Sequence, residues 1–157
     1  DDGAFVFTNL PGGKARLRAT VQQPGNSIAR IDEFELPAGQ ALKRDFSFVP
    51  GVEVSGEIKA KNLTQPLRVI AVEGETVRLP ASTSGNFLTS EQAMRTLGAC
   101  GTQPDEKFRL RSVPAGKVTL WVLSALNRSP YDEMVPLATK AVEVGREPVT
   151  GVVLEVP

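Results

Sequence analysis

Few residues of this 157-residue chain have side chains that could carry out chemistry. The sequence contains no histidine, which is the commonest general base and metal ligand in proteins, and it contains one cysteine, Cys100. Serine–histidine and cysteine–histidine nucleophiles, histidine-bearing metal sites, thiolate zinc clusters and internal disulfides are therefore excluded. An enzyme that uses only carboxylates remains open.

The acidic residues occur in close pairs that fall at expected strand ends and loops. None of these pairs belongs to a spaced acidic loop of the kind that binds calcium. We therefore expect solvated charge at these positions, and no catalytic residue, metal or cofactor. The pairs are Asp32-Glu33, Glu73/Glu75, Asp105-Glu106 and Asp132-Glu133.

A ten-residue motif occurs twice in the chain. Residues 5–14 read FVFTNLPGGK and residues 108–117 read FRLRSVPAGK, so equivalent positions differ by 103 (108 − 5 = 117 − 14 = 103). A phosphate-binding loop is a poor interpretation, because no helix is expected after the glycines.

The motif is better explained as a turn between two paired strands. Proline cannot donate a hydrogen bond to a strand ladder, and glycine accepts a positive φ. We predict structural turns at Pro11 and Gly13 in the first copy and at Pro114 and Gly116 in the second.

The charge balance limits the partners that the chain can attract. With 18 basic and 18 acidic residues and no basic cluster, no overall field would recruit nucleic acid or an anionic membrane. No 18-residue apolar run predicts membrane insertion. A signal peptide removed before residue 1 is compatible with this sequence.

Fourteen glycines and twelve prolines separate short alternating apolar runs, a pattern typical of an all-β antiparallel sandwich. Residues 80–105 interrupt the pattern, and we predict a helical insertion there. Its helix would cover residues 89–98, with Thr89 as N-cap, Gln92 completing a capping box and Gly98 ending it. The predicted strands cover residues 4–7, 14–21, 28–36, 41–48, 52–58, 67–72, 76–79, 107–110, 117–123, 134–144 and 149–156.

The repeat divides the chain near Pro50-Gly51. Both copies follow the order strand, Pro-x-Gly turn, strand, loop, strand, turn and strand, and the offset between copies grows to 106 at Gly39 and Gly145 (145 − 39). The strands expected between residues 52 and 79 precede the second copy. The first copy has no counterpart to them.

This layout resembles the carboxypeptidase regulatory-like domains, which are prealbumin-like (transthyretin-like) β-sandwiches. Val54-Ser55-Gly56-Glu57-Ile58 is similar to the opening strand of that family, residues 66–72 to its second strand, and residues 108–120 to its central hairpin. The resemblance implies one complete domain at residues 51–157 and only the second half of another at residues 1–50. It also implies an accessory role without catalytic residues.

Two aromatic residues are candidates for a binding platform. Trp121 lies between the core-facing Leu120 and Val122, so we expect it to point away from the core. Either the 80–105 insertion covers it, through Met94 or Leu97, or it is an exposed platform for a sugar ring or a partner, with Tyr131 as its companion.

Cys100 is expected in a loop after the predicted helix. Its thiol is either an inert or buried group, or the donor of an intermolecular disulfide in an oxidising compartment.

Half a sandwich leaves backbone groups and apolar side chains without partners. Three arrangements are open: a longer array was cut, the half-domain extends the sheet of the complete domain, or a strand from another subunit completes it. The sequence does not choose among them, and the third is attractive because the predicted strands at residues 41–48 and 149–156 are both good edge strands. The leading hypothesis is a non-enzymatic structural or interaction protein of a secreted or cell-surface (or periplasmic) assembly, in one form a filament joined by strand exchange. The alternative is a polysaccharide-binding accessory module.

Overall fold

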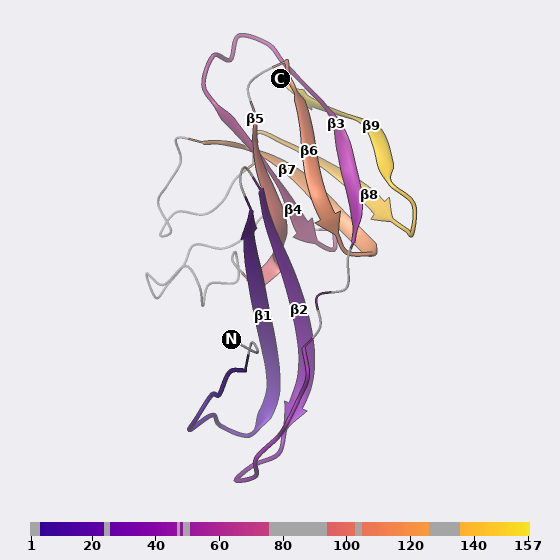
Figure 1. Ribbon diagram of the computed structural model, residues 1–157. Coiled ribbons are helices and arrows are strands. Elements are labelled where there is room, and N and C mark those ends of the chain that lie inside the picture. The colour runs from indigo at the N-terminus through magenta and orange to yellow at the C-terminus, as the bar shows by residue number, and fades with distance from the viewer. Residues whose placement is uncertain are drawn as a thin grey trace.

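The computed structural model describes residues 4–23, 26–46, 48, 51–75, 94–102, 105–125 and 136–157. Strands dominate these residues and form two sheets, so the predicted all-β sandwich is confirmed. The larger sheet has six strands in the order β1-β2-β5-β4-β7-β8, and the smaller has three in the order β6-β3-β9 (Figure 1). The strands are β1 (Gly13–Gln23), β2 (Asn26–Leu36), β3 (Val52–Ala60), β4 (Leu67–Glu73), β5 (Thr96–Thr102), β6 (Lys107–Val113), β7 (Gly116–Ser124), β8 (Ala138–Val144) and β9 (Val149–Val156).

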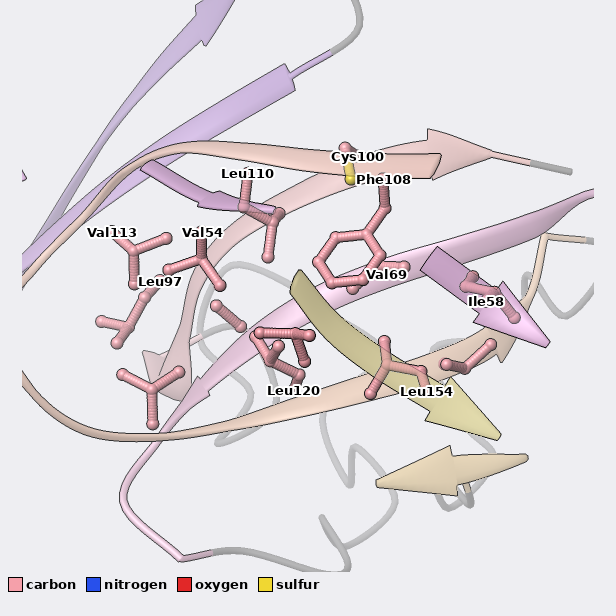
Figure 2. Packing of buried hydrophobic residues seen from close by; sticks show 14 of the residues in the cluster. Val54, Ile58, Val69, Leu97, Cys100, Phe108, Leu110, Val113, Leu120 and Leu154 are labelled. Carbon is pink, nitrogen blue, oxygen red and sulfur yellow. The ribbon is translucent and has the colours of Figure 1, made fainter. Parts of the chain in front are cut away.

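The main core brings together apolar side chains from both sheets. β3, β6 and β9 supply one side, and β4, β5 and β7 supply the other (Figure 2). Alternation places every second side chain of β7 in this layer, through Val118, Leu120 and Val122. The labelled core residues are Val54, Ile58, Val69, Leu97, Cys100, Phe108, Leu110, Val113, Leu120 and Leu154.

β4 is buried on both faces, as its nearly continuous apolar run predicts. Val69 and Ala71 belong to the main core, whereas Ile70 and Val72 belong to a second buried cluster. The six-stranded sheet therefore has a buried region on each side.

The sandwich differs from a purely antiparallel one at a single pair of described strands, β3 and β9, which run parallel. Their register shifts between Val54 and Gly56, opposite a bulge in β9 where Gly151 has a φ of +71°. A Cβ atom added to Gly56 would lie 1.8 Å from the Val152 carbonyl oxygen. The glycine of the Val54-Ser55-Gly56 motif is therefore required by the close approach of the β9 backbone.

Replacing Gly56 by alanine is expected to lower the free energy of unfolding by about 1–3 kcal/mol or more, because the added methyl group meets backbone that cannot rotate away. Gly101→Ala is the matched control, since a Cβ at Gly101 meets nothing within 4 Å and no positive φ is required there. Urea denaturation measures both. Equal midpoints for the two variants would contradict the close approach of β3 and β9.

The predicted helix at residues 89–98 is wrong in its C-terminal part. Thr96–Thr102 is strand β5, and helical conformation among the described residues is limited to Met94 and Arg95. Gly98, expected to end a helix, pairs with Ala71 on one side and Ile28 on the other. Two free strand edges, from β4 and β2, decide the conformation of this segment more strongly than a local capping pattern does. Thr89 and Gln92 lie outside the described residues.

Two predicted strands of the first copy are also wrong. Residues 4–12, which we call the N-terminal segment, contain no strand, and residues 40–46 with Phe48, which we call the connecting segment, contain none either. Both have apolar residues spaced as in a strand. A strand requires a hydrogen-bonded neighbour, however, and neither segment is paired into one of the two sheets.

The two halves of the chain share a sheet. β1 and β2 form a hairpin of eleven residue pairs, and β2 pairs with β5 only through Asn26, Ser27 and Ile28. The far end of the hairpin extends away from the body of the sandwich, towards the bottom of Figure 1. This is the extended-sheet arrangement, the second of the three considered from the sequence.

Candidate interaction surface

The repeated motif adopts the same turn conformation in both copies. Asn9 and Ser112, which are equivalent at the offset of 103, both have a φ of 59°, an uncommon value for residues other than glycine. Gly13 and Gly116 have φ values of +121° and +133°. The sequence repeat is therefore also a repeat of backbone geometry, at Pro11 to Gly13 as at Pro114 to Gly116.

The apolar side chains of the motif have opposite environments in the two copies. In the second copy they are at most 2% exposed, and in the first they are at least 53% exposed. The equivalent pairs are Phe5 and Phe108, Phe7 and Leu110, and Leu10 and Val113.

Strand β3 accounts for this difference. In the second copy, β3 lies between β6 and β9, pairs with both, and buries the motif's apolar residues against the main core. The counterpart of β6 in the first copy is the N-terminal segment. That segment is not paired into either sheet, and its Phe5 and Phe7 rings contact each other edge to face, with centroids 5.6 Å apart, and remain exposed to solvent.

The connecting segment is the counterpart of β9. In the β1–β2 hairpin Gly13 pairs with Leu36, and in the β7–β8 hairpin the equivalent Gly116 pairs with Val144. Leu36 and Val144 are therefore equivalent, and the numbering offset between the two copies is 108 in this region (144 − 36) rather than 106. Phe46 and Phe48 then correspond to two buried core residues of β9, Leu154 and Val156 (154 − 46 = 156 − 48 = 108). The rings of Phe46 and Phe48 pack edge to face with their centroids 5.7 Å apart, and Phe48 is exposed.

Arg44 holds the connecting segment beside β2. Its guanidinium donates two hydrogen bonds to the Asp32 carboxylate, at 2.6 and 3.1 Å, and lies 4.9 Å from the centre of the Phe34 ring. The hydrogen bond from Arg44 lowers the pKa of Asp32.

Gly12, at the end of the N-terminal segment, lies against Ala38, because a Cβ on Gly12 would be 2.8 Å from the Ala38 Cβ. The end of the N-terminal segment therefore lies against the turn that follows β2 and precedes the connecting segment.

Polar contacts attach the hairpin to the sandwich. Arg30, which is 9% exposed, donates to the Ser112 carbonyl and hydroxyl oxygens at 3.1 Å each, and the Gly51 amide donates to the same hydroxyl at 2.9 Å. Burial lowers the pKa of Arg30, although an arginine stays charged at neutral pH. Arg16 pairs with Glu73 on β4. The sequence offered no signal for the Arg30–Ser112 contact, because 82 residues separate the two.

Trp121 points to the opposite face of the sheet from Leu120 and Val122, as predicted, and it is 0% exposed. It belongs to the second buried cluster, so the exposed-platform interpretation is wrong for this residue. Leu97 does not cover it, because Leu97 belongs to the main core. Tyr131, its proposed companion, lies outside the described residues.

Cys100 lies in strand β5 rather than in a loop, and it is buried in the main core. Burial raises the pKa of its thiol. A buried, protonated thiol is a poor nucleophile and cannot reach a second chain while β5 stays in place. The geometry therefore agrees with the inert-thiol interpretation.

Several of the described carboxylates make ion pairs with basic side chains at or near the surface. Glu33 pairs with Arg16 at 3.3 Å and Glu75 with Lys117 at 3.2 Å. Among the described residues, no group of three or more potential ligands could hold a metal ion, and no helix has the length and apolar character needed to cross a bilayer.

Comparison with known proteins gave no match to a family model, a curated protein or a solved structure. The resemblance to carboxypeptidase regulatory-like domains stays a prediction that rests on the quoted motifs.

Proposed function

We propose that this chain is a non-enzymatic structural or interaction protein of a secreted or cell-surface assembly, and that its first half joins it to its neighbours. The observation that carries the proposal is the distribution of exposed apolar side chains. Of eight large apolar residues exposed in the described part of the chain, seven lie in the first 48 residues: Phe5, Val6, Phe7, Leu10, Val21, Leu42 and Phe48. The eighth is Leu137.

Exposed apolar groups and unpaired strand edges are typical of surfaces that bind other polypeptides. The outer edge of β1 is such an edge, because β1 is the terminal strand of the six-stranded sheet. A chain without net charge also has no overall repulsion to oppose association.

The sandwich core provides no comparable surface for the polysaccharide-binding alternative, because its main candidate, Trp121, is buried. The association hypothesis has no such conflict, since each residue on which it depends is exposed.

Sedimentation velocity over a wide range of protein concentration tests the proposal. We expect the purified chain to associate reversibly, and the double variant Phe5→Ser/Phe7→Ser to associate much less. Leu137→Ser is the matched control, because it removes an exposed apolar residue outside the first half. A monomer at every concentration, or equal association of the two variants, would refute the proposal. Electron microscopy of the associated species distinguishes a filament from a closed oligomer.

A further inference from the structure

The second copy of the repeat has a central strand, β3, and the described part of the first copy has no equivalent of it. The sequence pattern of β3 indicates what kind of segment could bind there. In the second copy, the motif strand β6 and the last strand β9 are held together by β3, the central strand of the small sheet. In the first copy, the N-terminal segment and the connecting segment are the counterparts of β6 and β9. The N-terminal segment carries exposed Phe5 and Phe7 and the connecting segment carries exposed Phe48, at positions whose equivalents are buried in the core.

We infer that the first half binds a two-stranded segment of the β3–β4 type that lies outside residues 1–157. The first strand of this partner inserts between the N-terminal and connecting segments, and its second strand pairs with the outer edge of β1. The inference rests on the proposed association function and specifies what the partner must be.

The required pattern of the partner follows from β3 and β4. β3 places Val54 and Ile58 in the core at 0% exposure, with Gly56 between them where the β9 backbone comes close. β4 is apolar on both faces and pairs with β7 over seven residues. The partner therefore has an alternating strand with a central glycine, followed by a strand that is nearly continuously apolar.

The edge of β1 is suited to the second strand. β7 pairs with β8 on one side and β4 on the other, whereas β1 pairs with β2 and has no described strand on its other side. At the offset of 103, the β7 residues that pair with β4, from Val118 to Ser124, correspond to residues 15–21 of β1. Val21, 41% exposed, lies at the end of this stretch.

Asn9 provides a contact for the start of the incoming strand. Its equivalent, Ser112, accepts a hydrogen bond at 2.9 Å from the amide of Gly51, the residue immediately before β3. Asn9 has the same φ of 59° and carries a side-chain carbonyl oxygen that can accept an equivalent bond. This position therefore keeps an acceptor in both copies.

A second copy of this chain is a poor donor of the segment. β3 and β4 are interior strands of their own sheets, and releasing them would expose Val54, Ile58 and Val69, which are each 0% exposed. The partner is therefore a segment with the same two-strand pattern that is not already held in a folded sandwich.

A synthetic peptide with the sequence of residues 51–75, labelled with a fluorophore, serves as the probe. We expect saturable binding to the full chain by fluorescence anisotropy, and slower amide exchange at residues 4–10. Binding should weaken at least about tenfold with the Phe5→Ser/Phe7→Ser chain and remain unchanged with Leu137→Ser. A peptide with Val54→Asp and Ile58→Asp is the control on the probe side, because the charges cannot enter an apolar layer.

A filled-site chain completes the test. Placing residues 51–103 directly before Asp1 rebuilds the first copy in full, because residue 104 is equivalent to residue 1 (104 − 103). This longer chain should not bind the peptide. No binding to the original chain, binding unaffected by the serine substitutions, or equal binding to the filled-site chain would each overturn the inference.

The peptide also separates this inference from the proposed function. If the chain associates but the peptide neither binds nor dissociates the associated species, the association surface stands and its assigned partner is wrong. If the peptide binds to a chain that is monomeric throughout, the partner chemistry stands and association between copies is refuted.

Discussion

Replacing Phe108 by alanine is expected to lower the free energy of unfolding by about 3–5 kcal/mol, whereas replacing Phe5 by alanine should change it by no more than about 0.5 kcal/mol. The two phenylalanines occupy the same position of the same motif. Phe108 is 2% exposed within the main core, and its removal leaves a cavity, whereas Phe5 is 53% exposed and leaves none.

Urea denaturation followed by the fluorescence of the single tryptophan measures both variants. A second matched pair, Leu110→Ala and Phe7→Ala, repeats the comparison, since Leu110 is 0% and Phe7 60% exposed. Equal losses within either pair would mean that the first copy is already packed, and the proposed association surface would then be wrong.

Replacing Trp121 by alanine is also expected to lower the free energy of unfolding by about 3–5 kcal/mol. The side chain is fully buried in the second cluster, with Ile70, Val72 and Leu123, and truncation removes a large apolar surface from that cluster. Circular dichroism during urea denaturation follows the loss, since the variant lacks the fluorophore.

Acrylamide quenching of the native chain is an independent check on the position of Trp121. We expect weak quenching in the folded protein and strong quenching in urea, because only unfolding exposes the indole. Strong quenching of the folded chain, together with a neutral effect of Trp121→Ala, would restore the exposed-platform interpretation.

The strands of the second copy could be predicted from the sequence because each has a clear local pattern. β3 and β6 alternate, and β4 is a continuous apolar run, so periodicity alone placed them close to their observed bounds. The Pro-x-Gly turns could also be predicted from local sequence, because their final residue has a positive φ and glycine accepts a positive φ without strain.

Strand β5 could not be predicted in this way. Its sequence around Gly98-Ala99-Cys100-Gly101 has small side chains and no alternation, and its burial is continuous from Leu97 to Cys100. Its conformation depends on the two strands that flank it, and such long-range pairing leaves no trace in local periodicity.

The candidate surface was accessible to sequence reasoning only in part. The repeat identified Phe5 and Phe7 as equivalents of core residues, and the missing counterpart of β3 was visible from the order of the motifs. Alternation also predicted the face on which Trp121 lies. It could not predict whether that face is covered, because burial depends on elements that are remote in sequence.

Strand β5 pairs with β2 from the first half of the chain and with β4 from the second. The segment that is repeated in the sequence is therefore not the segment that folds as a unit. The repeat divides the sequence near residue 50, yet β5, which follows that point, pairs with β2, which precedes it, and Arg30 of β2 is bonded to Ser112. A cut at residue 50 would leave one edge of β5 open and remove Arg30 from Ser112. Gene segments that look modular in this chain would therefore not be interchangeable modules, and any construction that recombines them needs to carry β5 together with the hairpin it supports.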